Sequence, residues 1–313
     1  MKHLFVVNPI AGGGKGNMEK AEQIRQYMEK RGEEFEVYIT SRPMDAAEKV
    51  MRDAAQGGEL RVYACGGDGT LNECVHGAAG FKNAAVTHYP CGTGNDFIRM
   101  FGDDAQLFRD LDALMDGEVM AMDVIDCNGR KCINICSVGI DARIGCDVHK
   151  YSNLPLVSGS GAYIVSAVVN LLKGINTPLS IKANGYANEG DFSLVCVCNG
   201  RYYGGGFNPS VNAMPNDGDL EMLVATHVNI FTAAKVIGKY ATGRAAELPE
   251  LVTILHGKKI EITSPEDMAI NIDGELMISK TAAIHLVPGG VNFLVPKGMK
   301  FFQNSAENAK TAQ

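Results

Sequence analysis

The stretch from Cys65 to Glu73, which reads CGGDGTLNE, carries the clearest chemistry in the sequence. Its three glycines remove side chains and permit positive φ, so a ligand can approach the backbone closely. The amides at the start of the helix that follows favour an anion such as phosphate. Asp68 is a poor phosphate ligand by itself, but its carboxylate suits a Mg2+ ion beside a phosphate. The alternative is a plain strand–turn–helix connection in which Asp68 caps the helix.

Two more glycine-rich loops have a similar layout. The first runs from Asn8 to Gly16 and the second from Pro90 to Phe97, and each follows an apolar stretch. The first is not a Walker A loop, because no GK[ST] follows at the required spacing. It also lacks the complete GxGxxG pattern, which disfavours a Rossmann dehydrogenase. If each loop ends a parallel strand, all three lie at the carboxyl edge of one sheet, where ligands bind in such folds.

Further carboxylates stand within or after apolar strands. Asp123 lies alone between apolar residues, so it needs a partner, which favours a site role. Met214 to Asp219, which reads MPNDGD, is typical of a cation loop, because hard cations take carboxylate and carbonyl oxygens. A solvated acidic turn is the alternative there. Asp273-Gly274-Glu275 follows an apolar strand, and Asp-Gly is also a strong hairpin signal.

Alternating strands and helices must position these loops. The pattern predicts strands at residues 3–8, 35–40, 60–65 and 84–89, with helices at 17–31, 45–56, 71–79 and 104–115. This order implies a parallel, three-layer α/β fold of the nucleotide-binding kind. Farther on, alternation and turn residues predict a second, mostly-β domain. Its expected strands are 119–127, 131–138, 179–183, 192–198, 220–225, 259–263, 268–272, 282–286 and 291–295, with helices at 161–173 and 230–242.

Composition narrows the classes of protein. The 313 residues suggest about two domains, and the net charge of −7 argues against a nucleic-acid partner. Nine cysteines without a CxxC pair or a secretory signal predict buried reduced thiols in the cytoplasm rather than a zinc site. No apolar run approaches the ~20 residues of a spanning helix. We therefore expect no transmembrane segment, and only peripheral contact with a membrane.

The order of these motifs resembles the diacylglycerol kinase catalytic family, which also holds sphingosine kinases and bacterial soluble lipid kinases. The matching blocks are Val7-Asn8-Pro9 with Gly12, Gly66 to Asn72, Gly92 to Phe97, Tyr203 to Gly206, Asn216 to Leu220 and Ile272 to Glu275. The resemblance implies an ATP-binding α/β domain at residues 1–124 and a β-sandwich-like lipid-substrate domain at 125–297. Residues 298–313 would return to the first domain.

The resemblance also implies roles for individual residues. Around ATP it places Asn8, Pro9, Ile10, Ala11, Gly12, Thr40, Gly66, Gly67, Asp68, Gly69, Thr70, Leu71, Asn72, Glu73, Thr93, Asn95 and Asp96. Two residues depart from the family pattern. Ala11 stands where the family usually has Ser, which removes one hydroxyl contact to phosphate. Asn216 stands where an Asp is common, which weakens the charge of a metal site.

The catalytic and metal-binding residues follow from the same resemblance. Asp68, Asp96 and Asp123 would lie near a catalytic Mg2+, although Asp96 could instead cap the helix after it. Asp217 would hold a second, structural Mg2+, and its neighbours Met214 and Asp219 could each contribute only a carbonyl. The general base would be Asp273 or Glu275, because a carboxylate can accept the proton of a lipid hydroxyl.

We therefore expect an ATP-dependent lipid kinase that transfers the γ-phosphate to a lipid hydroxyl, with diacylglycerol as the first candidate and phosphatidic acid as its product. The alternatives are a kinase for another lipid alcohol, such as a sphingoid base or another glycerolipid, and a nucleotide-sensing module without turnover. The lipid partner places the expected protein in the cytoplasm at a membrane surface, with a homodimer as one option. The candidate membrane surface joins Arg143, His149, Lys150 and Tyr151 to the apolar run Leu154 to Val157.

Overall fold

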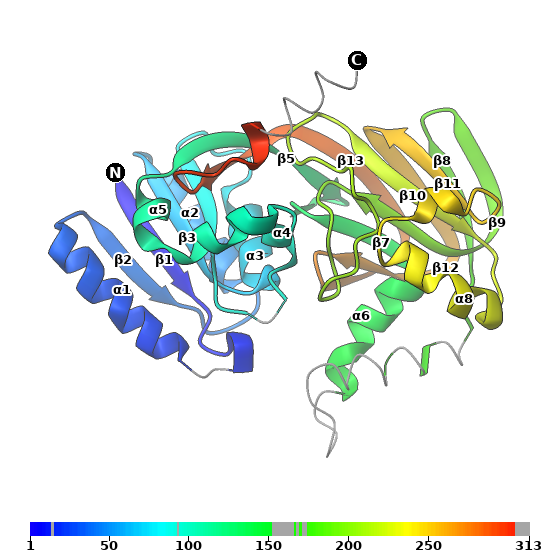
Figure 1. The fold of residues 1–313 in the computed structure, drawn as a ribbon, viewed down its shortest axis with the longest axis horizontal. Coiled ribbons are helices and arrows are strands. Elements are labelled where there is room, and N and C mark those ends of the chain that lie inside the picture. Colours follow the sequence, from blue (N-terminus) through cyan, green and yellow to red (C-terminus); the bar gives the residue numbers. More distant parts are fainter. Residues whose placement is uncertain (14–15, 93, 152–165, 167–168, 171–173, 304–313) are drawn as a thin grey trace. The chain divides into compact units, whose positions relative to one another are not determined.

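The computed structural model describes residues 1–13, 16–92, 94–151, 166, 169–170 and 174–303. The chain forms two compact units, which are Met1–Met122 together with Gly289–Gln313, and Asp123–Pro288 (Figure 1). The second unit is therefore an insertion in the first. The expected division at 124/125 lies two residues from the observed one, whereas the return to the first unit begins at Gly289, before the expected residue 298.

A parallel sheet forms the centre of the first unit. Its strands are β1 (Lys2–Val7), β2 (Phe35–Ile39), β3 (Leu60–Gly66) and β4 (Ala84–Pro90), in the order β2-β1-β3-β4. The end of β13 (Glu275–Val295) adds a further strand, where Asn292 and Phe293 pair in parallel with Ala85 and Val86. This pairing is why the return begins early. The continuous apolar run Leu4–Val7 is buried, as expected of a strand covered on both faces.

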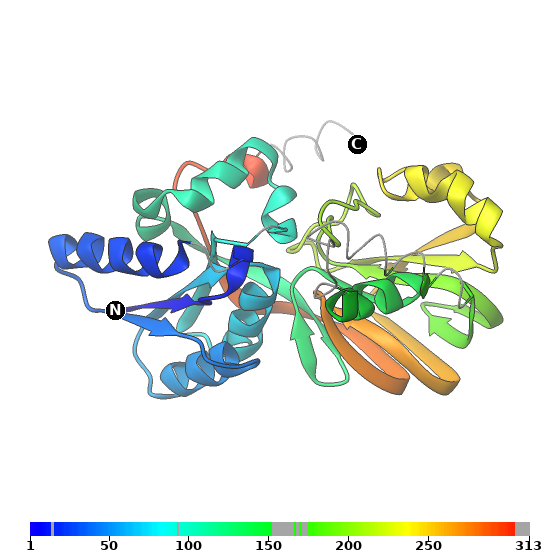
Figure 2. The same cartoon turned by 90° about the horizontal axis from the view of Figure 1, so that it is seen from below.

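Helices cover both faces of this sheet, so the expected three-layer α/β fold is confirmed. Figure 2 shows α1 (Asn17–Arg31) with the 3-10 helix η2 (Gly102–Arg109) and α5 (Leu111–Met115) on one face. On the other lie α2 (Asp45–Ala55) and α3 (Asp68–Ala78). Two short helices, η1 (Ala11–Gly13) and α4 (Asp96–Arg99), belong to the glycine-rich loops.

Two expected helices differ from the observed ones. The helix expected at 104–115 is divided into η2 and α5, because the Asp110 side chain accepts hydrogen bonds from the amides of Asp112 and Ala113 and starts a new helix. The helix expected from residue 71 already begins at Asp68, directly after Gly67. The first turn of α3 therefore lies inside the glycine-rich stretch.

The second unit is a mostly antiparallel β structure, as expected. Its strands are the end of β5 (Glu118–Cys127), β6 (Arg130–Cys132), β7 (Ile135–Gly139), β8 (Thr177–Ala183), β9 (Tyr186–Cys198), β10 (Leu220–Thr226), β11 (Val252–Gly257), β12 (Lys259–Ile272) and the start of β13. The strands expected at 259–263 and 268–272 are one strand, β12, with an irregularity between Thr263 and Met268. Likewise, β13 joins the two expected strands 282–286 and 291–295.

Strict alternation gives this β structure two apolar faces. On β9, Val195 and Val197 face a large core shared with β8, β10 and β12. The intervening Leu194 and Cys196 face a second cluster with Tyr240 of α8 (Ile230–Tyr240). The sequence predicted α8, but not β11 or α6 (Ile140–Tyr151), and the short 3-10 helix η3 (Ala245–Glu247) was also not expected. The helix expected at 161–173 falls largely outside the described residues.

Candidate active site

The three glycine-rich loops meet at the carboxyl ends of β1, β3 and β4. The amides of Cys91 and Gly92 donate to the carbonyl of Gly66 at 2.7 and 3.0 Å. A Cβ on Gly92 would lie 2.5 Å from the Cα of Gly67, and one on Gly12 would lie 2.5 Å from the carbonyl oxygen of Cys91. Because backbone packs on backbone here, the glycines are needed for the loops to approach one another.

Asp68 connects two of these loops. Its Oδ1 accepts hydrogen bonds from the amides of Asp96 (2.6 Å) and Phe97 (3.3 Å), which start α4. Asp68 is thus a helix cap, but of α4 rather than of its own helix. A Cβ on Gly94 would lie 2.7 Å from Oδ2 of Asp68 and 3.8 Å from Oδ2 of Asp96. Both carboxylates therefore border the narrow space beside Gly94, which is too small for a Cβ.

The environment of Asp68 disfavours its charge. Burial raises the pKa of its carboxyl, and the amides of Phe97, Asp96 and Asn95 only partly oppose that rise. The Oδ1 atom of Asp96 pairs with Arg99 at 3.2 Å, which leaves its Oδ2 beside Gly94. A cation at this point would favour the charged form of Asp68.

Several other residues expected around ATP hold the loops in shape. The Asn8 side chain donates to Oγ1 of Thr70 at 3.3 Å, and the Asn17 side chain donates to the carbonyls of Asn8 and Ala11. Asn95 donates to the carbonyl of Gly92 at 2.8 Å. Thr40 follows β2 and its amide donates to Val7. Pro9 is half-buried, the exposed Ile10 belongs to the same loop, and Gly69 lies in the first turn of α3.

Three of the residues expected around the nucleotide have side chains with structural roles. Leu71 is buried in the core, and its amide donates to Gly67. Asn72 is buried on α3 as well. The two carboxylate oxygens of Glu73 accept from the amides of Met44 and Ala46, so Glu73 caps α2. Thr93 lies outside the described residues.

Asp123 belongs to the second unit and binds the expected cation loop there. Its Oδ2 accepts from the amide of Gly218 at 2.8 Å, and its own amide donates to Pro215 at 2.7 Å. Asp123 thus has the polar partner that a buried acid needs, and this partner is the loop from Met214 to Asp219. Burial raises the pKa of Asp217, and the nearby Asp219 and Asp123 carboxylates add to the rise.

The other two expected ligands of the structural cation, Asp219 and Met214, already contact other side chains. The Asp219 carboxylate pairs with His256 at 2.8 Å, and the Met214 sulfur lies 3.1 Å from the Arg201 guanidinium. Within the described residues, no group of three or more His, Cys, Asp or Glu side chains converges as a metal site.

The two candidates for the general base differ in their surroundings. Three successive amides, those of Ile133, Asn134 and Ile135, donate to the two carboxylate oxygens of Asp273 at 2.8–3.3 Å. Such bonds stabilise the carboxylate and make it a weak base. Glu275 is half-buried at the start of β13, where its backbone pairs with Ile272, and its carboxylate has no hydrogen bond or ion pair with any other described residue.

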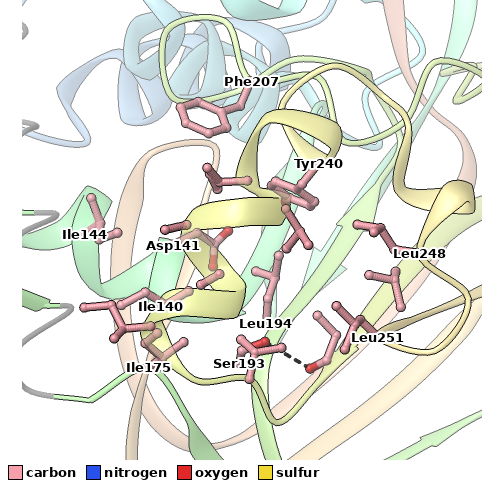
Figure 3. A pocket seen from close by; sticks show the side chains of 18 of the residues that line it. Ile140, Asp141, Ile144, Ile175, Ser193, Leu194, Phe207, Tyr240, Leu248 and Leu251 are labelled. Atoms are coloured by element: carbon pink, nitrogen blue, oxygen red, sulfur yellow. Dashed lines mark hydrogen bonds between the residues drawn. The ribbon is translucent and has the colours of Figure 1, made fainter.

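An apolar cavity of about 260 Å³ lies within the second unit (Figure 3). It is lined from β9 by Ser193 and Leu194, from α6 by Ile140 and Ile144, and from α8 by residues that include Ala233, Val236 and Tyr240. The volume approaches the roughly 300 Å³ at which ligand pockets begin. The turn Gly204–Gly206, all at positive φ, brings Tyr203 and Phe207 of the cavity wall together.

One acid, Asp141, stands in the wall of this cavity. Burial raises its pKa to about 6, although the hydroxyls of Ser137 and Tyr203 lie close enough to oppose the rise. Its Oδ2 is buried without a hydrogen bond of ordinary geometry to a described residue. The hydroxyl of Tyr203 lies 2.8 Å from that of Tyr240. This group was not predicted, because its only signal in the sequence is a single acid after the largely apolar run Ile135–Ile140.

Only part of the expected membrane surface lies within the residues that the structure describes. The Arg143 guanidinium donates to the carbonyls of Gly174 and Ile175, so this residue is engaged inside the unit. The side chains of His149, Lys150 and Tyr151, and all of Leu154 to Val157, lie outside the described part. Among the described residues, no helix is long and apolar enough to cross a bilayer.

Comparison with known families matches both units. Residues 2–127 match the diacylglycerol kinase catalytic domain, and residues 134–295 match the YegS C-terminal NAD kinase beta sandwich-like domain. A probable lipid kinase YegS-like from Stenotrophomonas maltophilia is 28% identical over 92% of this chain and 95% of its own. Lipid kinase YegS from Escherichia coli K12 is 27% identical over 94% and 95%.

Solved structures share the fold. A putative diacylglycerol kinase from Bacillus anthracis superposes with a TM-score of 0.74 at 23% identity, covering 95% of this chain and 96% of its own. The glycine loops, the β-sandwich unit and the two family matches agree. The chain belongs to the YegS and diacylglycerol kinase family of lipid kinases.

Proposed function

We propose that this lipid kinase transfers the γ-phosphate of ATP to the hydroxyl of diacylglycerol and releases phosphatidic acid. The observation that carries the lipid part is the apolar cavity of the second unit, whose wall holds a single acid, Asp141. A cavity of this kind suits an acyl chain, and an acid in its wall suits the hydroxyl of the same molecule. On this proposal the first unit binds ATP and the second binds the lipid.

The glycine-rich loops supply the phosphate-binding part of the proposal. Gly67 caps α3 without a side chain, so the first turn of α3 is open to a phosphate oxygen. Asp68 and Asp96 would hold Mg2+ at the space beside Gly94, and the ion would neutralise charge on the phosphates. Asp217 would hold a structural Mg2+, which should raise the melting temperature without nucleotide and not in Asp217→Ala.

We assign the general base to Glu275 rather than to Asp273. A lipid hydroxyl needs a carboxylate that can take its proton as the new O–P bond forms. The Asp273 carboxylate already accepts three amide hydrogen bonds, whereas Glu275 has no such partner in the described chain. Asp273 then serves to hold the turn from which Glu275 projects.

One observation favours a second substrate class, the sphingoid bases. Asp141 is a buried acid that forms no ion pair with a described residue, and the ammonium group of a sphingoid base would supply one. The purified protein should be incubated with labelled ATP, Mg2+ and separate vesicles that contain diacylglycerol or sphingosine. Labelled phosphatidic acid is the expected product. If sphingosine phosphate is the only labelled product, the substrate is a sphingoid base and not diacylglycerol. If no lipid is labelled, both substrate proposals are contradicted.

A further inference from the structure

Helix α8 has an unusual distribution of apolar residues. Phe231 is 77% exposed, Ile237 48% and Ile230 40%, while the only buried residue of the helix is Tyr240 at its end. Helices of this length on soluble units normally bury an apolar stripe and expose polar residues. Phe231 therefore stands out as a large aromatic side chain held in contact with solvent.

The charge around α8 also differs from that of the rest of the chain. The chain has a net charge of −7, yet residues 222–246 contain no Asp or Glu and three basic residues, Lys235, Lys239 and Arg244. Lys239 and Arg244 share Glu247 at 3.1 and 4.0 Å. Lys235 is exposed and has no ion pair with any described residue. Glu247 offsets the charge of Lys239 and Arg244, so Lys235 is the cation of α8 that no described carboxylate offsets.

The opposite side of the same helix forms part of the cavity wall. The cavity is lined from α8 by Ile230, Ala233, Ala234, Val236, Ile237 and Tyr240, but not by Phe231 or Lys235. Figure 1 and Figure 2 both show α8 at the periphery of the second unit. Phe231 and Lys235 therefore lie on the face of α8 away from the cavity, while the partly exposed Ile230 and Ile237 belong to the cavity wall.

We propose that α8 is the surface by which this protein docks on an anionic lipid bilayer, with Phe231 inserted at the interface and Lys235 at the headgroups. An exposed aromatic beside basic residues is the pattern of interfacial helices, and the charge complements an anionic surface. The proposal rests on the proposed function only in one respect, which is that a lipid substrate gives the protein a reason to dock. Docking itself needs neither ATP nor turnover. It replaces the surface around Arg143 to Val157 that the sequence analysis considered.

Docking can be measured by co-sedimentation of the full chain, without ATP, on vesicles of phosphatidylcholine with or without phosphatidylglycerol. We expect binding to the anionic vesicles that weakens with added salt. Phe231→Ser should reduce the partition coefficient about tenfold or more, because a buried Phe side chain is lost from the interface. Lys235→Glu should reduce it by a similar factor, and on anionic vesicles only.

Matched controls separate docking from general effects. Met51→Ser removes an exposed apolar residue of α2, and Lys258→Glu reverses an exposed charge elsewhere in the second unit, so both should sediment like the wild type. Phe231 and Lys235 lie on the surface, so unchanged melting temperatures are expected. Sedimentation of Phe231→Ser and Lys235→Glu at the wild-type level would overturn the proposal. A dimer of the wild type that Phe231→Ser converts to a monomer would also overturn it, because α8 would then be an apolar contact between two copies.

Activity assays distinguish this proposal from the proposed function. With a short-chain, monomeric diacylglycerol, Phe231→Ser should turn over at the wild-type rate, while its rate on vesicles should fall with its binding. A wild type that binds vesicles through α8 but phosphorylates no lipid would contradict the proposed function and leave the docking surface intact. A wild type that phosphorylates the soluble lipid but binds no vesicle would contradict docking alone.

Discussion

At the scale of single residues, Asp68 caps a helix, and the role of a Mg2+ ligand, which the sequence offered as the alternative, stays a proposal for its second oxygen. Its Oδ1 caps α4 through the amides of Asp96 and Phe97, and its Oδ2 borders the space beside Gly94. A carboxylate can do both at once, because its two oxygens face different partners. The two roles can be separated by substitution.

Asp68→Asn should keep the cap and lose the charge. Because Asn retains the oxygen that accepts from Asp96 and Phe97, we expect a melting temperature near that of the wild type and a loss of turnover of about 10²-fold or more. Asp68→Ala should lose the cap too and cost about 1–2 kcal/mol of stability. Thermal unfolding and labelled-ATP turnover measure both effects. Activity of Asp68→Asn above about a tenth of wild type would reduce Asp68 to a cap.

Substitution should likewise separate a structural from a catalytic role for the two acids of the β12–β13 turn, Asp273 and Glu275. Asp273→Asn places an amide against three backbone N–H groups, so we expect a loss of about 2–3 kcal/mol in the free energy of unfolding. Glu275→Gln should leave stability unchanged and reduce kcat by about 10²–10⁴-fold. Urea unfolding and steady-state kinetics give the comparison. The reverse pattern would assign the base to Asp273.

Asp141 gives a prediction for pH. Its folded pKa of about 6 lies above the ordinary 3.8, so ionisation destabilises the folded state. The cost is absent below the ordinary value, develops between the two and is complete above about pH 6. Asp141→Asn should therefore gain stability over the wild type as pH rises through this window, by about 3 kcal/mol at most. Melting curves of both proteins across the window test this, and a constant difference would contradict it.

At the scale of elements, the glycine-rich loops depend on direct contact between backbones. Gly92→Ala should lower the free energy of unfolding by about 1–3 kcal/mol and raise the KM for ATP, because its Cβ would clash with Gly67. Gly238→Ala on α8 is the matched control: nothing lies within 4 Å of that Cβ, so helix stability should rise by about 0.5–1 kcal/mol. A wild-type KM for ATP in Gly92→Ala would show that the loops tolerate separation.

The elements also show what local sequence pattern can and cannot reveal. The parallel strands and their glycine loops were predicted because each is a short apolar run followed by an unmistakable turn. The cavity was not, since Ile140, Leu194, Tyr240 and Val252 lie far apart in sequence and meet only in the fold. Helix α6 was missed because it begins directly at the end of β7, after Gly139 at φ 116°, without a polar capping residue. The side chains of Leu71 and Glu73, which the resemblance placed around ATP, occupy a core and a capping position, and a motif read by itself does not separate such positions from ligand contacts.

At the scale of the whole molecule, the first unit is complete only when the end of β13 has joined its sheet. Phe293 is fully buried and packs against Phe97 and Phe108, and the amides of Lys300 and Phe301 donate to Asp104. The sequence predicted the return to the first domain, but it placed the start after this strand. No local signal marks where one continuous strand, β13, passes from one unit to the other.

A chain that ends after Pro288 should therefore lose ATP binding, because the first unit lacks the strand beside β4 and the Phe293 packing. We expect rapid proteolysis within residues 1–122 and protection within 123–288. A chain that ends after Gln303 keeps every described residue of the return and should behave as the full protein. Nucleotide binding and limited proteolysis measure this, and ATP binding by the shorter chain would contradict it.

The inserted order of the two units has a consequence for synthesis on the ribosome. All of Asp123–Pro288 emerges before Gly289–Val295, so the second unit can finish folding while the first, although made earlier, still lacks a strand. The nascent first unit then exposes the edge of β4 that awaits β13, and such unpaired edges favour aggregation. The second unit should thus mature first, and the first unit only when residues 289–295 have left the ribosome.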